Sequence, residues 1–412
     1  MTRSDFASLL GAPAGLVAEP RTEATVVEFS EPRRFMAGLA AAAALGGPVL
    51  LASAAWGEGE RRQLEELRRQ PPVTPATAAG KGWLGIPTGG TGGRLKFARH
   101  DEETIAAAVR GFARHFSIAQ VNAAGVLPLH HVSGLMAWMR CALTGGEYRP
   151  LDWQAVAAGE LPELPAKAQG WTISLVPTQL ERLLRNPAAA TWLQQFRAVF
   201  VGGGPGAAPL FDRAAQLELA VSLGYGMTET AAMVTALRPF EFLAGHRGGG
   251  TALPHARVAV DADGRIVVGG DSLFRGYHPQ WRDRRDFVTE DLGRLDPAGH
   301  LHVRGRRDAV IITGGEKVDP AEVEAALRDS GEFPDVVVLG RDDPEWGQVV
   351  VAAYPAAASP DLGKVGQWMA SRLAAYKRPR RFVAVADWPV NEQGKVNRDR
   401  LREMLGNLKP ES

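Results

Sequence analysis

Short apolar runs alternate with amphipathic segments through the first 240 residues of this 412-residue chain. Three examples are AQVNAAGVLPL (119–129), GWTISLVPTQLERLL (170–184) and FRAVFVGGG (196–204). A buried strand, a turn and a helix in repetition indicate parallel strands joined by helical crossovers. We therefore expect an α/β fold in which a large N-terminal domain of mixed or parallel sheets is flanked by helices.

The pattern changes from about residue 245. ARVAVDADGRIVVGG (256–270) consists of two alternating runs around Asp263-Gly264, which is a strong hairpin signal. GRLDPAGHLHVRG (293–305) repeats this arrangement around a Pro-Ala-Gly turn. We expect a small antiparallel, β-barrel-like subdomain at about 245–306.

A third pattern follows residue 306. The segment 308–330, DAVIITGGEKVDPAEVEAALRDS, reads as a strand, a Gly-Gly turn and a helix, and Pro320 suits the first helical turn. Further strands and a helix follow it. We therefore divide the chain into an N-terminal domain at 1–307 and a mobile α+β C-terminal domain at 308–412.

Composition excludes several classes of protein. The formal net charge of +1 gives no electrostatic reason to expect binding to nucleic acid. The single cysteine, Cys141, excludes an intrachain disulfide.

The stretch from Met36 to Trp56 carries no charge, but Gly46-Gly47-Pro48 divides it into a helix-like and a strand-like half. We therefore expect a buried helix–turn–strand unit there and no stable membrane insertion. The N-terminus lacks a secretory pattern, and we expect the cytoplasm.

A glycine-rich stretch, IPTGGTGGRLKFARH, occupies residues 86–100. Glycines let backbone N–H groups approach an anion, threonine hydroxyls add donors, and lysine adds a positive charge. A plain surface loop is the alternative. The nucleotide-binding pattern that requires Gly-Lys-Ser/Thr is absent, because Lys96 lies between Leu95 and Phe97. The candidate phosphate-binding residues are Thr88, Gly89, Gly90, Thr91, Gly92 and Lys96.

This loop resembles the signature of the acyl-adenylate-forming, or AMP-binding, superfamily, although Gly92 stands where a hydroxyl residue is usual. GYGMTET (224–230) resembles the adenine and metal motif of that family, DLGRLD (291–296) the ribose motif, GRRDAVIITGGEKVDPAEVEAAL (305–327) the hinge motif, and NEQGKVNRDRL (391–401) the catalytic-lysine motif. The resemblance implies that Tyr225 stacks on adenine, Thr228 contacts the α-phosphate, Glu229 binds Mg²⁺ and Asp291 binds ribose. It also implies nucleotide contacts for Gly203, Gly224, Gly226 and Arg306, and a catalytic role for Lys395.

The resemblance implies a reaction in two steps. A substrate carboxylate attacks the α-phosphorus of ATP to give an acyl-adenylate and pyrophosphate, and the thiol of CoA then displaces AMP. In the family the C-terminal domain rotates between the steps, so Asp308 would be the hinge, and the Gly314-Gly315 face would replace Lys395. We expect ATP, Mg²⁺ and CoA as cofactors and co-substrates.

The segment 127–140, LPLHHVSGLMAWMR, points to the acid. Together with LVPTQL (175–180), it resembles the o-succinylbenzoate–CoA ligases of menaquinone and phylloquinone biosynthesis. His131 would be the pocket histidine, and Arg140 would meet the carboxylate of this aryl acid that is not activated. An unpaired carboxylate in an apolar pocket is costly, and the planar guanidinium suits it. The alternative for Arg140 is a side chain that reaches the surface or pairs with a nearby Asp.

Three alternatives to this function remain. Another aryl- or acyl-CoA ligase would use the same residues on a different acid. An adenylation protein would load the thiol of a carrier protein instead of free CoA. A degenerate nucleotide-binding protein is a third reading, suggested by Gly92, and the presence of Glu229, Asp291, Arg306 and Lys395 argues against it. We leave open whether the chain forms a homodimer.

Overall fold

A seven-stranded sheet forms the centre of the computed structural model, which describes residues 1–16, 22–88, 95–164, 170–204, 208–283, 285–390 and 396–406, with only the backbone at 308. Its strand order is β11-β10-β9-β8-β7-β5-β6. Strands β5 to β9 are parallel to one another, whereas β10 is antiparallel to both β9 and β11. The bounds are β5 Asn122–Gly125, β6 Tyr148–Pro150, β7 Trp171–Leu175, β8 Ala198–Val201, β9 Val221–Met227, β10 Ala232–Ala236 and β11 Thr251–Ala252. The predicted parallel strands are thus confirmed.

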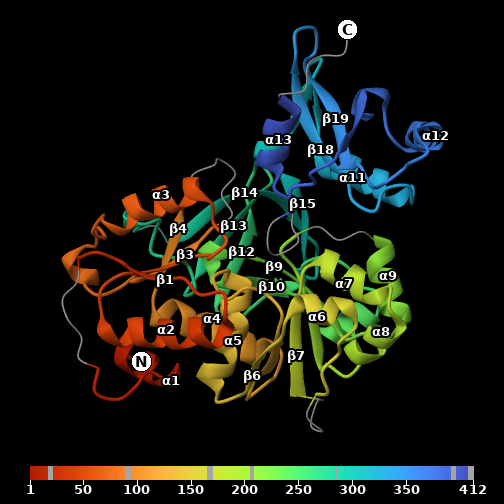
Figure 1. Cartoon of the computed structure of the whole chain (residues 1–412). Helices are drawn as coiled ribbons and strands as arrows, with labels where there is room; N and C mark the ends of the chain where they lie inside the picture. The colour runs from red at the N-terminus through yellow and green to blue at the C-terminus, as the bar shows by residue number, and fades with distance from the viewer. Residues whose placement is uncertain are drawn as a thin grey trace.

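A four-stranded sheet lies beside it in the N-terminal part of the chain (Figure 1). Its strands are β1 (Thr25–Val27), β2 (Val49–Leu51), β3 (Leu84–Pro87) and β4 (Phe97–His100); the first three are parallel, and β4 is antiparallel to β3. The uncharged stretch at 36–56 falls on α2 (Pro32–Leu45) and β2, as the sequence predicts. Within the described ranges, the structure contains no helix with the length and apolar character that crossing a bilayer requires.

Two helices, α4 (Glu102–His115) and α5 (Val132–Thr144), lie between these two sheets. One face of the pair packs on the first sheet through residues such as Ile105 and Leu135, and the other packs on the central sheet through Phe112 and Cys141. The remaining helices of this region are α1 (Arg3–Leu9), α3 (Glu58–Arg68), α6 (Trp153–Ala158), α7 (Pro177–Leu184), α8 (Pro187–Leu193), α9 (Ala208–Gln216) and α10 (Pro239–Leu243). The opposite face of the central sheet is covered by α7 to α9.

The residues around Asp101 fix where α4 begins. Its carboxylate caps the helix by accepting hydrogen bonds from the backbone N–H groups of Glu103 and Thr104. The same carboxylate, although buried, forms an ion pair of 2.8 Å with the guanidinium of Arg275. Burial acts against the charged form, but the Arg275 guanidinium outweighs it and holds the pKa of Asp101 below its usual range. The start of α4 is therefore tied to the segment that contains Tyr277.

The antiparallel part is a four-stranded sheet in the order β12-β13-β14-β15. Its strands are β12 (Ala256–Val260), β13 (Arg265–Gly270), β14 (Asp286–Leu295) and β15 (Leu301–Arg306). Each adjacent pair is antiparallel, which confirms both predicted hairpins.

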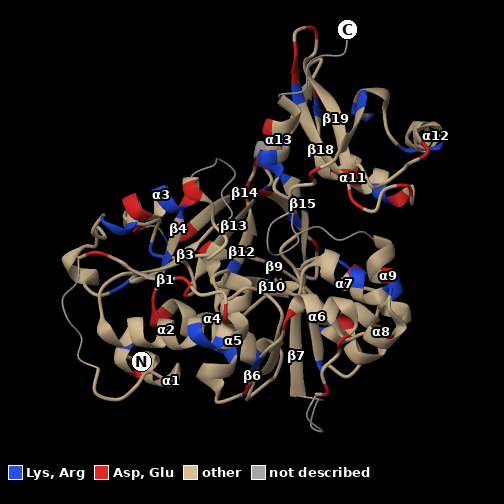
Figure 2. Cartoon of the chain, in the orientation of Figure 1, with Lys and Arg blue, Asp and Glu red and all other residues tan. Residues whose placement is uncertain are grey.

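The chain ends in a separate sheet, at the top of Figure 1. It contains β16 (Ile311–Thr313), β17 (Glu316–Val318), β18 (Val337–Asp343), β19 (Gly347–Pro355) and β20 (Arg381–Val385). Helices α11 (Pro320–Asp329) and α12 (Leu362–Arg372) cover one face, and α13 (Arg398–Gly406) covers the other. The short strand β17 was not expected from the sequence. Basic and acidic residues are interspersed along the described part of the chain (Figure 2).

Candidate functional site

The two ends of the glycine-rich loop are held together by a backbone hydrogen bond. The Thr88 N–H donates to the Lys96 carbonyl at 2.9 Å, directly beyond the antiparallel pair β3 and β4. The described residues therefore place both ends of the loop beside the first sheet. Gly89, Gly90, Thr91 and Gly92 lie outside the described residues.

The GYGMTET segment forms β9 and the short 3₁₀ turn Thr228–Thr230 that follows it. Gly226 has to be a glycine, because a Cβ atom there would lie 1.9 Å from the Ala232 carbonyl oxygen as the chain reverses into β10. Gly224 and Tyr225 lie on the same strand. The carbonyl of Thr228 accepts a hydrogen bond of 2.8 Å from Nε2 of the buried His100. These contacts fix the backbone from which Thr228 and Glu229 project.

Glu229 has a partner that the sequence did not indicate. The hydroxyl of Tyr277 donates a hydrogen bond of 2.6 Å to Glu229 Oε1. Lys96 Nζ lies 5.6 Å from the centroid of the Tyr277 ring, within reach of a cation–π attraction. Lys96, at the end of the glycine-rich loop, and Glu229, the predicted metal ligand, thus both lie beside Tyr277. Their common neighbour lies 48 residues beyond Glu229, with no local motif to mark it.

Three predicted nucleotide-binding residues, distant in sequence, lie together. The Tyr225 hydroxyl donates to Asp291 Oδ2 at 2.6 Å, and Arg306 Nη1 lies 3.4 Å from Asp291 Oδ1. Burial, and then the Asp291 carboxylate, raise the pKa of Tyr225, so its hydroxyl keeps its proton. Asp291 is paired with Arg306 across β14 and β15, which places the arginine at the end of the antiparallel sheet.

His131 is the N-cap residue of α5, and its ring lies 4.2 Å from that of His130, centroid to centroid. The helix begins at Val132, directly after His131. Gly134 permits this course, because a Cβ atom there would lie 2.3 Å from the Pro128 carbonyl oxygen. The imidazole of His131 is therefore positioned by a tight turn at the start of the helix.

Arg140 lies deep in the protein, with 6% of its surface exposed. Its guanidinium carbon is 3.9 Å from the centroid of the Phe112 ring and 6.0 Å from that of Phe200. Within the described residues no carboxylate forms an ion pair with Arg140, and its Nε atom has no hydrogen-bond partner. Burial lowers its pKa to about 10, which leaves it charged at neutral pH. It neither reaches the surface nor pairs with a described Asp, so it is a buried cation that lacks a counterion from this part of the chain.

The other predicted residues lie in loops and turns. Gly203 follows β8 with a positive φ of 81°, a conformation that favours glycine. Gly314 and Gly315, with φ of 56° and 84°, form the turn between β16 and β17. The backbone of Asp308 lies in a 3₁₀ turn that links β15 to β16. Lys395 lies outside the described residues.

Comparison with known proteins identifies the family. The family model for "AMP-binding enzyme" matches residues 24–278, well over half of the chain, and that for "AMP-binding enzyme C-terminal domain" matches residues 322–395. The chain belongs to the AMP-binding enzyme family. The family resemblance inferred from the loop and its companion motifs is confirmed.

Within the AMP-binding family, the chain is similar to several acid–CoA ligases. It is 32% identical over 284 residues to the 2-succinylbenzoate–CoA ligase of Listeria monocytogenes serotype 4b, covering 67% of this chain and 60% of that relative. The indoleacetate–CoA ligase of Aromatoleum aromaticum is 29% identical over 367 residues, covering 84% of this chain and 70% of that relative. The matched region thus spans less than two thirds of the first relative's length.

Solved structures share the fold. The o-succinylbenzoate CoA synthetase (MenE) of Bacillus subtilis, in complex with the acyl-adenylate intermediate OSB-AMP, has a TM-score of 0.76 and 23% identity, covering 99% of this chain and 92% of that one. ATP-bound MatB of Rhodopseudomonas palustris has a TM-score of 0.76 and 22% identity, covering 98% and 92%. The predicted fold, an α/β region followed by a C-terminal α+β unit, is confirmed.

Proposed function

We propose that this AMP-binding family member is a cytoplasmic, ATP-dependent acid–CoA ligase that converts 2-succinylbenzoate to 2-succinylbenzoyl-CoA in menaquinone or phylloquinone biosynthesis. It would form an acyl-adenylate with release of pyrophosphate, and then release AMP. The observation that carries the proposal is the meeting of Tyr225, Asp291 and Arg306, from three motifs far apart in sequence. The ring of Tyr225 would support adenine, and the Asp291 carboxylate would accept hydrogen bonds from ribose hydroxyls.

Glu229 fits a magnesium ion. Among the described residues, the hydrogen bond from Tyr277 engages Oε1 alone, so Oε2 would be the oxygen that meets a metal. Mg²⁺ is usually bound through one or two carboxylates together with substrate phosphates, so a site with one protein carboxylate suits it. Among the residues described, no group of three or more His, Cys, Asp or Glu side chains could hold a metal ion by itself. When bound at Glu229, Mg²⁺ would neutralise phosphate charge.

The remaining charge on the triphosphate would be met by the loop from Thr88 to Lys96, by Arg306 and by Lys395. The attack of a carboxylate anion on ATP brings two anions together, and fixed positive groups lower that barrier most. We propose that the chain divides at Asp308, with 1–307 as the adenylation domain and 308–412 as the mobile domain. Rotation there would withdraw Lys395 after the first step and bring the Gly314-Gly315 turn to the site for CoA.

Arg140 supports 2-succinylbenzoate as the acid. The succinyl carboxylate would be activated, and the aromatic carboxylate would enter the apolar surroundings of Phe112 and Phe200. An anion there would supply the counterion that the described residues do not give Arg140, directly or through water. His131, at the start of the same helix, would lie between the acid and the incoming thiol.

The test is a panel of acids incubated with the purified chain, ATP, Mg²⁺ and CoA, with acyl-CoA products identified by mass. We expect 2-succinylbenzoyl-CoA in large excess over indoleacetyl-CoA and malonyl-CoA. Transfer only to a carrier protein, or efficient turnover of a monocarboxylic aryl acid instead, would reject this substrate. Light scattering of the same sample tests whether the chain forms a homodimer, which would have a mass twice that of one chain.

A further inference from the structure

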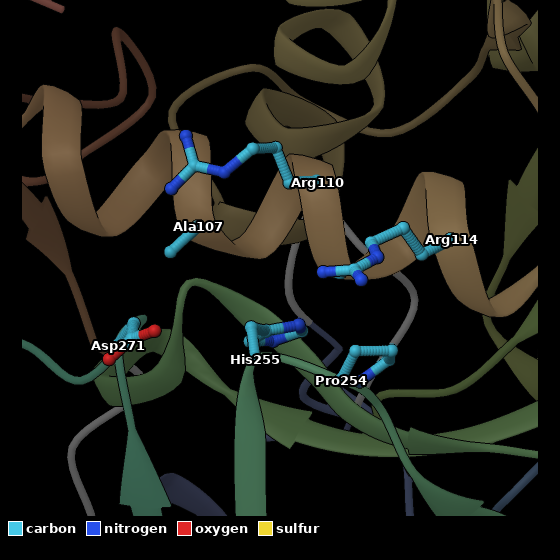
Figure 3. Close-up of a pocket in the computed structure, with 7 residues that line it drawn as sticks. Ala107, Arg110, Arg114, Pro254, His255 and Asp271 are labelled. Carbon is cyan, nitrogen blue, oxygen red and sulfur yellow. The ribbon is translucent and has the colours of Figure 1, made fainter.

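A small pocket opens beside α4, beyond the helix start that Asp101 caps (Figure 3). Its volume is about 70 Å³, and Arg110, Gly111 and Arg114 of α4 line it together with His255 and Asp271. Drug-sized ligands occupy roughly 300–1,000 Å³, so this pocket has room for one small group only. It lies about two to four helical turns along α4 from Asp101. The pocket is therefore separate from the residues assigned to the nucleotide.

The upper wall in Figure 3 is basic. Arg110 and Arg114 are four residues apart on α4 and hence neighbours on one helix face, where like charges repel. In the part of the chain that the structure describes, neither arginine forms an ion pair or a side-chain hydrogen bond. The buried Arg140 also lies near enough to His255 to disfavour its charged form. The pocket thus has excess positive charge on one side.

The lower wall contains the buried side chain of His255. His255 is 7% exposed, and neither of its ring nitrogens has a partner of normal geometry among the described residues. Burial lowers its pKa to about 4, although the nearby Met233 carbonyl acts in the opposite direction. The ring is therefore neutral at pH 7, with one N–H to donate. A bound acceptor would give this buried N–H the hydrogen-bond partner that the described residues do not supply in normal geometry.

Two further features hold this wall in place. Gly111 lets the ring approach the helix backbone, because a Cβ atom there would lie 1.8 Å from His255 Nδ1. The Asp271 N–H donates to the His255 carbonyl at 3.0 Å, so the exposed Asp271 carboxylate lies at the same wall. An anion with no hydrogen would be repelled by this carboxylate, whereas a ligand that also carries an O–H could donate to it.

We propose that this pocket binds monohydrogen phosphate, or the singly protonated phosphate group of a larger molecule, with Arg110 and Arg114 as the cationic contacts, His255 as an N–H donor and Asp271 as the acceptor for the P–O–H group. The arrangement distinguishes phosphate from sulfate, because sulfate has the same shape but no proton to donate at neutral pH. The proposed ligase reaction assigns no role to these four side chains.

The test is a titration of the full-length chain with inorganic phosphate at pH 7, followed by NMR of the His255 ring signals, which a His255→Asn variant assigns. This readout is local, so phosphate bound elsewhere does not produce it. We expect saturable shifts with a dissociation constant on the order of 1 mM. Arg114→Gln and Arg110→Gln should each weaken binding about tenfold. Arg213→Gln, an exposed arginine on α9, is the matched control and should leave binding unchanged.

A second titration, with sulfate in place of phosphate, tests the role of Asp271. We expect sulfate to bind about tenfold more weakly than phosphate or worse, and Asp271→Asn to remove that preference, because an amide can donate to sulfate. Competition by CoA but not by 3′-dephospho-CoA would identify a phosphate monoester as the source, and competition by neither would identify free phosphate. Unshifted His255 signals, or equal binding of both anions by the wild type, would overturn the proposal whether or not the chain is a ligase.

Discussion

Tyr277 donates a hydrogen bond of 2.6 Å to Oε1 of Glu229, from a position 48 residues further along the chain. The same ring contacts Phe274 edge to face, with 4.9 Å between centroids, and lies beneath Lys96. The backbone of Phe274 also donates to the Glu229 carbonyl at 2.8 Å. Glu229 is thus held by its side chain and its backbone from one segment, and that segment is fixed to α4 through Arg275 and Asp101.

Tyr277→Phe removes only the hydroxyl that orients Glu229. A hydrogen bond to a charged group contributes about 1.5–3 kcal/mol. We therefore expect the Mg²⁺ concentration for half-maximal activity to rise about tenfold, with kcat at saturating Mg²⁺ within about twofold of the wild type. Calorimetry of a non-hydrolysable ATP analogue should show the same shift of the Mg²⁺ requirement to higher concentration without turnover.

The control for this variant is Tyr376→Phe, at an exposed tyrosine in the C-terminal region. It should change neither quantity. If Tyr277→Phe lowered kcat at every Mg²⁺ concentration and left the Mg²⁺ dependence unchanged, Tyr277 would not position Glu229 for a metal.

The sequence could not have revealed Tyr277. Its place beside Glu229 depends on the pairing of Tyr277 with Ala98, which joins segments far apart in the chain. Local patterns, by contrast, were sufficient for the hairpins around Asp263-Gly264 and for the buried unit at 36–56, because turn residues and hydrophobic periodicity act over a few residues. Motif residues such as Asp291 could be proposed because a family resemblance carries long-range information that periodicity does not.

Arg140 is a second residue whose surroundings could not be predicted from the sequence alone. Its apolar neighbours in sequence indicated burial, but the aromatic rings of Phe112 and Phe200 come from other elements, α4 and β8. The sequence left two alternatives to a substrate contact for Arg140: an ion pair with a nearby Asp, or a side chain that reaches the surface. The described structure shows neither. A stacked buried guanidinium could be recognised only from the packing of α5 between the two sheets.

Arg140→Met tests the substrate contact with a neutral side chain of similar reach. Because an unpaired buried charge is costly, we expect the midpoint of thermal unfolding to stay the same or rise. The KM for 2-succinylbenzoate should rise roughly tenfold to a thousandfold, and the KM for ATP should change little. Arg140→Lys should recover part of the loss. A thermally stable Arg140→Met enzyme with an unchanged KM for the acid would remove Arg140 from substrate binding.

Lys395→Ala separates the two half-reactions. The lysine is expected to stabilise the anionic first transition state, so pyrophosphate exchange should fall at least about a hundredfold. Thioester formation from a supplied acyl-adenylate should remain near the wild-type rate, since Lys395 would have left the site by then. Rapid-quench measurement of both steps checks this, and equal damage to both would contradict the role.

Stability should fall in mild acid. Burial lowers the pKa of His100, His115 and His255 to about 4 in the folded chain. In the unfolded chain they titrate near the usual value of about 6.5, so between pH 6.5 and 4 the unfolded state binds more protons. The free energy of unfolding should therefore decrease as pH falls through that window, by about 1 kcal/mol per pH unit for each histidine.

Urea unfolding between pH 7.5 and 5 measures this slope. His115→Gln retains a donor for the Ala236 carbonyl, which His115 Nε2 contacts at 3.1 Å, and removes one titrating group. It should reduce the contribution of these histidines to the slope by about a third. A slope identical to that of the wild type would show that His115 is not held neutral by burial.

The formation of an acyl-adenylate from 2-succinylbenzoate is tested most directly by labelling the acid carboxylates with ¹⁸O and analysing AMP and acyl-CoA by mass. Attack of the succinyl carboxylate on the α-phosphorus of ATP makes one carboxylate oxygen the bridge of the adenylate. Displacement by the thiol of CoA then breaks the bond between that oxygen and the acyl carbon. We predict AMP with one ¹⁸O atom and pyrophosphate without label. Unlabelled AMP, ADP with phosphate, or the absence of 2-succinylbenzoyl-CoA would contradict the proposed function.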